Sequence, residues 1–125
     1  MIGFPSHDTD PVVLTEDHII SVLLVRRARD DALGQNLFSD PAWDILLELF
    51  GAKLGGRSIT ASDLARSIQT PLSTTLRWIS ALQQRGLIEC EIIEGDARSV
   101  ELSSEGVSRM ERLGSRWATA FLAIA

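Results

Sequence analysis

Cysteine is almost absent from this 125-residue chain, in which Cys90 is the single representative. One cysteine excludes a disulfide framework and every zinc site built from several cysteines. The chain also has no apolar run of the about 20 residues that a membrane-spanning helix requires. Its first ten residues show neither the basic start nor the apolar stretch of a signal peptide. We therefore expect a cytoplasmic protein that is neither secreted nor inserted in a membrane.

Motifs of catalysis and of metal binding are missing as well. The sequence has no glycine-rich phosphate loop, no nucleophile elbow, and no histidine near Cys90 in the order that a catalytic triad needs. Five potential ligands lie close together near the N-terminus, but their spacing matches no defined metal site: His7, Asp8, Asp10, Asp17 and His18. We expect no enzymatic activity, no metal and no cofactor.

The charge is unevenly distributed along the chain. The net charge of −5 argues against a protein that coats nucleic acid over its whole surface. Residues 1–56 and 87–125 are acidic, with net charges of −5 and −3, whereas residues 57–86 carry four arginines against one acid and are basic, at +3. A contact with nucleic acid would therefore involve the middle of the chain.

The remaining composition, 45% hydrophobic and 23% charged, is that of one globular domain. We read 1–14 as a flexible arm and 15–125 as a single domain. Helical spacing of apolar residues, with a capping residue before each run, predicts five helices. They begin at the caps Thr15, Ser39 or Asp40, Thr60, Thr70 with Pro71, and Ser103. The first four end near Gly34, Gly51, Gln69 and Gly86.

Between the fourth and fifth helices the period of hydrophobicity changes to two. Ile88, Cys90 and Ile92 alternate with glutamates, Gly95 and Asp96 form a turn, and 99–102 returns as a second strand. The fold expected is mainly α: a helix-turn-helix followed by a small β-hairpin wing, hence a winged helix.

The helix expected over 71–85 has two distinct faces. The inner face is formed by Leu72, Thr75, Ile79 and Leu82. The opposite face carries no acid and is formed by Ser73, Thr74, Arg77, Ser80, Ala81 and Gln84. In a major groove, arginine reads guanine, glutamine reads adenine, serine and threonine reach phosphates or base edges, and alanine meets a thymine methyl group. This face is the candidate DNA-binding surface.

Several short motifs support this interpretation. The segments 60–65, 73–79 and 82–88, then Asp96-Ala97-Arg98 and the run from Val100 to Gly106, resemble the DNA-binding core of MarR-type transcriptional regulators. The resemblance implies a DNA-binding core over 57–104, an arginine of the wing (Arg98) in the minor groove, and dimerisation helices at 15–33 and 103–125. It also implies that small aromatic anions can bind between the dimerisation helices and the DNA-binding lobe, although no residue marks such a site.

The sequence departs from the family pattern in three respects. The wing is two residues shorter between Arg98 and Leu102, and it carries four acids against Arg98 alone: Glu89, Glu91, Glu94 and Asp96. Acids there repel phosphate. Members of the family usually have a further C-terminal helix, so we expect a reduced or differently built dimer interface.

For several residues the sequence leaves two interpretations open. Arg77 reads a base or is a solvated arginine, and Arg98 contacts DNA or pairs with Asp96. Arg66 and Arg85 contact phosphate or are plain surface charges. Trp78 packs at the edge of the core or stacks on a base, with packing favoured. Cys90 is a buried thiol or a redox sensor, with burial favoured.

The sequence thus predicts a dimeric, sequence-specific regulator, a repressor, that binds a pseudo-palindromic operator in double-stranded DNA. The apolar surface over Ile19 to Val25 is wider than a small monomer can cover, which indicates a homodimer. The alternative is a winged helix that binds another protein. The acidic wing and the net charge favour that alternative, whereas the acid-free face around Arg77 favours DNA.

Overall fold

The computed structural model describes residues 14–34, 40–94 and 97–124, and within these ranges the chain forms five helices and three strands. Residues 1–13 of the expected arm and the turn at Gly95 and Asp96 lie outside the described residues, whereas Leu14, the last residue of that arm, is half-buried against the core. The elements are, in order, α1 (Glu16–Leu33), α2 (Pro41–Leu54), β1 (Ile59–Thr60), α3 (Ala61–Ser67), α4 (Leu72–Gln84), β2 (Ile88–Glu94), β3 (Ala97–Leu102) and α5 (Ser104–Ile124).

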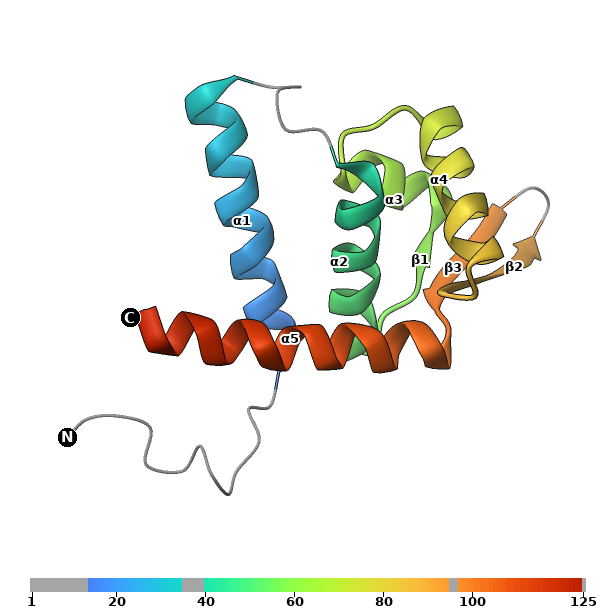
Figure 1. Ribbon diagram of the computed structural model, residues 1–125. Helices are drawn as coiled ribbons and strands as arrows, with labels where there is room; N and C mark the ends of the chain where they lie inside the picture. The colour runs from blue at the N-terminus through green and yellow to red at the C-terminus, as the bar shows by residue number, and fades with distance from the viewer. Residues whose placement is uncertain (1–13, 35–39, 95–96, 125) are drawn as a thin grey trace.

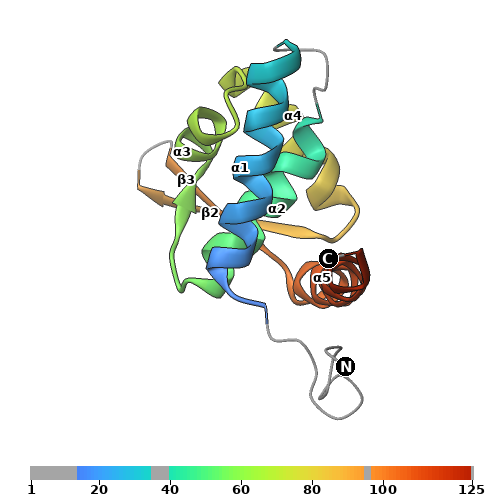
Figure 2. The same ribbon diagram turned by 90° about the vertical axis from the view of Figure 1, so that its left-hand side faces the viewer.

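The arrangement places α2 at the centre of the molecule (Figure 1). Helix α1 lies along one side of α2, and α3, α4 and the small sheet lie on the other side. Helix α5 passes beneath α1 and α2, and Figure 2 shows it almost end-on. Within the described ranges, no helix combines the length and hydrophobicity needed to cross a membrane.

Four of the expected helix caps are confirmed, since Thr15 is the N-cap of α1 and three others form a side-chain hydrogen bond, whereas the N-cap of α4 is Pro71 without such a bond. The carboxylate of Asp40 accepts a hydrogen bond from the backbone N–H of Trp43 at 3.3 Å, and Pro41 occupies the first turn of α2. The hydroxyl of Thr60 accepts from the N–H of Asp63 at 3.1 Å, and that of Ser103 accepts from Gly106 at 3.0 Å. The local sequence therefore fixes where these helices begin.

The expected end of α2 at Gly51 is wrong, because this helix continues to Leu54. Gly51 is buried in the contact with α1, where a β-carbon would lie 3.3 Å from the Cγ2 atom of Ile19. Glycine at this position allows two helices to pack closely and does not stop the helix.

The sheet has three strands, one more than expected, in the order β1-β3-β2. Both pairings are antiparallel, and Val100 lies opposite Ile59 on one side and Cys90 on the other. Strand β1 has only two residues and therefore no alternating pattern from which it could be predicted. Strand β3 begins at Ala97, two residues before the expected start.

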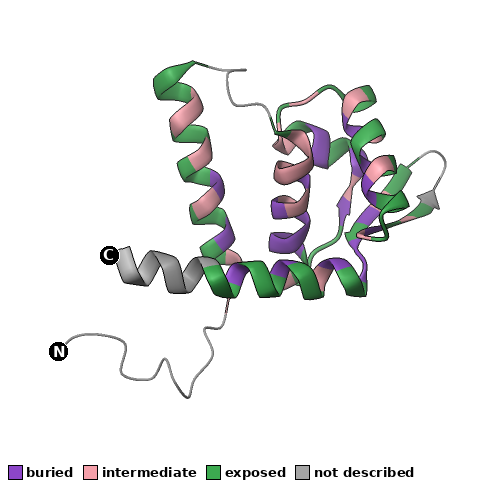
Figure 3. Ribbon diagram, viewed as in Figure 1, coloured by how far each residue is buried: buried purple, intermediate pink, exposed green. Residues whose placement is uncertain are grey.

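The core is formed mainly by one helix and the elements that surround it (Figure 3). Helix α2 contributes four almost completely buried side chains: Ile45, Leu47, Leu49 and Phe50. The helix-turn-helix and the sheet add a second group of buried side chains: Leu64, Ile79, Leu82, Ile88, Val100 and Leu102. Their burial is the main favourable contribution to folding.

Two apolar side chains expected inside are exposed. Leu72, the first residue of α4, is 44% exposed, and Ile92 on β2 is 68% exposed. Each has the correct periodicity for the inner face, but Leu72 is the first residue of its helix and Ile92 lies in the half of its strand nearer the hairpin turn. Periodicity gives the direction of a side chain and does not show whether anything packs against it.

Candidate functional site

Helix α4 separates its two faces largely as the periodicity predicts. Thr75, Ile79 and Leu82 are buried. On the opposite face Ser73, Arg77, Ser80 and Gln84 are exposed, whereas Thr74 and Ala81 are half-buried at its margin. These six residues are called the α4 face below. No acidic residue occurs in α4, so the face offers hydrogen-bonding groups and one positive charge.

The first turn of α4 depends on a buried hydroxyl. The backbone carbonyl of Pro71 accepts hydrogen bonds from the N–H of Thr75 at 2.9 Å and from its side-chain Oγ1 at 3.0 Å. Thr75 is fully buried, so this bond satisfies a polar group that would otherwise be costly to bury. With its hydroxyl satisfied within its own helix, Thr75 can be buried on the inner face, opposite the α4 face.

Arg77 is exposed near the middle of this face. One Nη atom lies 3.4 Å from Oγ1 of Thr74, at the long end of the range for a hydrogen bond. None of the ion pairs among the described residues involves Arg77. The guanidinium group is therefore available to bind an anion or a base edge.

A tight turn sets α3 against α4. Gln69 has a backbone φ of 54°, in the left-handed region that non-glycine residues seldom occupy. The N–H groups of Gln69 and Thr70 donate to the carbonyls of Arg66 and Ala65, and Oγ1 of Thr70 donates to the carbonyl of Ile68. These bonds stabilise the turn of the helix-turn-helix.

Arg66 lies on α3 and not on the helix that carries the α4 face. Arg66 is exposed on α3 and forms an ion pair with Asp63, one helical turn earlier. An arginine in an exposed pair can exchange its carboxylate partner for a phosphate at little cost. Arg85 follows α4 directly and is also exposed.

The wing places its charges on two different faces. The register pairs Glu89 with Glu101, Glu91 with Ser99, and Ile92 with Arg98. Because side chains alternate along a strand, these glutamates share one face, and exposed Arg98 belongs to the other face. Glu89, Glu91 and Glu101 therefore point away from Arg98. The pair of Arg98 with Asp96 lies outside the described residues.

Similarity to known proteins is found among solved structures and not among family models or curated sequences. No protein-family model matches the sequence, and no curated protein matches it significantly. Among solved structures, a candidate DNA-binding protein from Ralstonia eutropha is 26% identical, with a TM-score of 0.54 over 61% of this chain and 98% of its own. The complex of Staphylococcus aureus MepR with DNA is 19% identical, with a TM-score of 0.59 over 82% of each chain.

A third similar structure is NadR in complex with 4-hydroxyphenylacetate, which is 20% identical, with a TM-score of 0.60 over 84% of this chain and 76% of its own. MepR and NadR are regulators of the MarR type. The chain shares the winged-helix fold of MepR and NadR. The expected fold is thereby confirmed, and strands β2 and β3 form the wing that follows the helix-turn-helix.

Two side chains of the winged helix are more exposed than expected. Trp78 on α4 is 40% exposed, more than the expected packing at the edge of the core would leave. Cys90 is half-buried rather than fully inside. Burial raises the pKa of the Cys90 thiol, and the charge of Arg98 lowers it by a smaller amount. The net shift favours the unreactive thiol over the thiolate.

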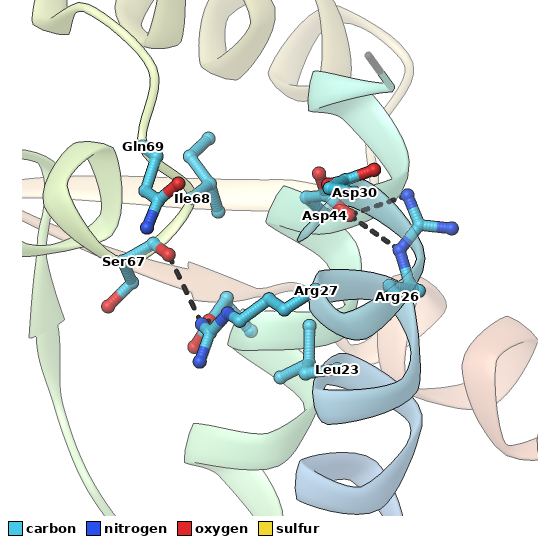
Figure 4. A pocket seen from close by; sticks show the side chains of 9 residues that line it. Leu23, Arg26, Arg27, Asp30, Asp44, Ser67, Ile68 and Gln69 are labelled. Carbon is cyan, nitrogen blue, oxygen red and sulfur yellow. Dashed lines mark hydrogen bonds and ion pairs between the residues drawn. The ribbon is translucent and has the colours of Figure 1, made fainter. Parts of the chain in front are cut away.

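A small cavity of about 40 Å³ lies between α1, α2 and the helix-turn-helix (Figure 4). Two arginines of α1 border it. Arg26 forms an ion pair with Asp44 at 2.7 Å, and Arg27 forms one with Glu48 at 3.1 Å and donates to the carbonyl oxygen of Ser67 at 3.2 Å. No sequence motif predicts this cluster, because its members are far apart in the chain.

Proposed function

We propose that this chain is a sequence-specific regulator of transcription that binds double-stranded DNA with α4 in the major groove. The observation that carries the proposal is the exposed, acid-free α4 face centred on Arg77. A winged helix presents such a helix to the edges of base pairs. The similarity to MepR, which has been solved with DNA, supports the same use of the fold here.

Within this proposal the α4 face supplies the base contacts and the flanking arginines supply the charge contacts. Arg77 is placed to make the bidentate contact with guanine, and Gln84 the contact with adenine. Arg66 and Arg98 add phosphate or minor-groove contacts, which position the protein without reading sequence directly. Glu89, Glu91 and Glu101 point to the face opposite Arg98, so their repulsion of phosphate near Arg98 is weaker than the sequence alone indicates.

The proposal also includes a homodimer that acts as a repressor on a pseudo-palindromic operator. Exposed apolar side chains on α1 support it, because Ile20, Leu24 and Val25 are 43%, 56% and 67% exposed. A second copy would cover this surface. Two α4 helices that read successive major grooves on one side of the duplex would then be about 34 to 36 Å apart. We place this activity in the cytoplasm.

The test is an electrophoretic mobility shift with DNA from upstream of the protein's own gene. Saturable binding that survives excess unrelated duplex supports the proposal. Equal affinity for both duplexes, or no binding by protein shown to be folded, contradicts it.

A second candidate function, the binding of another protein, is favoured by one feature of the sheet. Glu89 and Glu101 lie directly opposite each other, and Glu91 shares their face. Like charges in this position destabilise a sheet. A basic protein surface would relieve that repulsion, and loss of partner binding on changing Glu89 to glutamine, with DNA binding absent, would favour this function.

We include a small aromatic acid as a candidate effector, because NadR has been solved with 4-hydroxyphenylacetate. The cavity of about 40 Å³ is large enough for water but not for such a molecule. A second, open hollow of about 630 Å³ is lined by Glu89, Glu91 and Glu101, whose negative charge repels an acidic ligand. The proposal is therefore that an aromatic acid binds at a site completed by a second subunit. Release of operator DNA by added 4-hydroxyphenylacetate would support this part of the proposal, and unchanged binding at saturating concentrations would contradict it.

A further inference from the structure

Arg27 connects three helices through one guanidinium group. It extends from α1, and its Nη2 atom donates to Oε1 of Glu48 in α2 at 3.1 Å and to the backbone carbonyl of Ser67 at 3.2 Å (Figure 4). Glu48 is largely buried, with 14% of its side chain exposed, whereas 47% of the Arg27 side chain is exposed. The buried carboxylate therefore holds the guanidinium group against the end of α3.

Ser67 is the last residue of α3, where backbone carbonyls lack partners within the helix. The carbonyls of Leu64, Ala65 and Arg66 accept from N–H groups of the turn that follows. The carbonyl of Ser67 accepts from Arg27, which is 40 residues earlier in the chain. A cation is also favoured at this end of a helix, because the partial charge there is negative. Arg27 thus completes the C-terminus of α3 from another helix.

This contact lies two residues before Gln69, whose left-handed conformation sets the direction of α4. Building on the proposed function, we infer that Arg27 is a positioning residue that fixes the helix-turn-helix relative to α1. In the proposed dimer, α1 carries the exposed apolar surface and α4 carries the α4 face. The hydrogen bonds of Arg27 would then set the distance and orientation of the two α4 helices on one operator. Arg27 itself would not contact DNA.

Arg26 provides a matched control on the same helix. Its ion pair with Asp44, at 2.7 Å, is shorter than the 3.1 Å pair of Arg27 with Glu48. This pair joins α1 to α2 and does not involve α3. The variants Arg26→Met and Arg27→Met each remove one guanidinium group and keep most of the apolar stem. If Arg27 served only general stability, the two variants would behave alike.

The first measurement is amide hydrogen exchange of the protein without DNA. In Arg27→Met, we expect the amides of Gln69 and Thr70 to exchange roughly 3- to 10-fold faster, the range for loss of one hydrogen bond from a partly exposed charged group. In Arg26→Met, the same amides should exchange at the parent rate. Equal rates in both variants, whether both parental or both accelerated, would overturn the inference.

The second measurement is operator affinity together with sedimentation. We expect Arg27→Met to bind the operator several-fold more weakly while it stays dimeric and folded, and Arg27→Lys to recover part of the affinity through one donated hydrogen bond. Arg26→Met should bind as the parent does. If the parent itself binds no DNA, the proposed function fails, whereas the exchange rates still decide whether Arg27 holds the turn. If Arg27→Met bound the operator as tightly as the parent does, the proposed role of Arg27 in orienting the α4 helices would be overturned.

Discussion

The hydroxyl of Ser103 donates a 2.6 Å hydrogen bond to the backbone carbonyl of Gly86. Gly86 follows the end of α4 with a φ of 76°, and the same hydroxyl accepts from the N–H of Gly106 to begin α5. One buried side chain therefore joins the end of α4, which carries the proposed recognition face, to the start of a proposed dimerisation helix. Ser103 acts as a helix cap and also as a link between two helices.

Removal of this hydroxyl should destabilise the fold. Ser103→Ala loses the cap of α5 and leaves the carbonyl of Gly86 without its side-chain donor, so we expect a loss of about 1 to 3 kcal/mol in the free energy of unfolding. Urea denaturation measures it. The neighbouring Ser104 is exposed, and Ser104→Ala should change the stability by no more than about 0.5 kcal/mol. A similar small change in both variants would mean that the link contributes little.

Much of the fold could be predicted because its signals are local. Asp40, Thr60 and Ser103 identify helix starts by side-chain hydrogen bonds that span three residues. The periodicity of α4 places Thr75, Ile79 and Leu82 inside, which defines the α4 face by elimination. These patterns depend on neighbours in the chain and can be read without knowledge of tertiary structure.

The features that were missed depend on residues far apart in the chain. Strand β1 exists because Ile59 pairs with Val100, and a two-residue strand has no periodicity of its own. The separation of Glu89, Glu91 and Glu101 from Arg98 follows from the register, which the sequence did not reveal in full. The bond between Arg27 and the carbonyl of Ser67 involves a backbone group, so no residue type at position 67 could indicate it.

The proposed dimer can be tested on α1. Leu24→Glu places a charge in the middle of the exposed apolar surface of this helix, where burial against a second copy would leave the charge unpaired. We expect a dimer in the parent and a monomer in the variant by analytical sedimentation at micromolar concentration. Ile92→Glu makes the same change at an exposed site on the wing and should remain dimeric. A parent that sediments as a monomer contradicts the dimer.

Cys90 should not act as a redox switch. Burial raises the pKa of its thiol, and Arg98 offsets this only in part, so the reactive thiolate is rare at neutral pH. Operator affinity should be insensitive to peroxide in both the parent and Cys90→Ser. Release of DNA by peroxide in the parent, abolished in Cys90→Ser, would reverse this assignment.

Two glutamates should give opposite dependences of stability on pH. Burial raises the pKa of Glu48 above its ordinary value of 4.5, with Arg27 opposing the shift, so Glu48 binds protons more tightly in the folded state. Its contribution to stability is complete below pH 4.5 and is lost as the pH rises through the raised pKa. The hydrogen bond from Arg109 lowers the pKa of Glu105, whose contribution is present above pH 4.5 and is lost as the pH falls.

Urea denaturation between about pH 4 and about pH 7 measures this difference. Relative to the parent, Glu48→Gln should gain stability as the pH rises, and Glu105→Gln should lose it. Parallel pH profiles for the two variants would contradict the assigned directions. The comparison also measures how far burial destabilises the ionised form of Glu48, which holds Arg27.

Substitutions of Arg77 and Arg98 should distinguish contacts that read bases from contacts that contribute only charge. Arg77 is exposed on the acid-free α4 face, where a bidentate contact with guanine contributes about 1 to 3 kcal/mol of discrimination against other bases. Arg77→Ala should therefore weaken specific binding and relax the preference at one base position in each half-site. Arg98→Ala should weaken binding to all duplexes alike and reduce the slope of log affinity against log salt by about 1. Binding measured over an operator library and a salt series checks both. If Arg77→Ala kept both affinity and sequence preference, α4 would not read DNA, and the acidic face of the wing would become the surface to test.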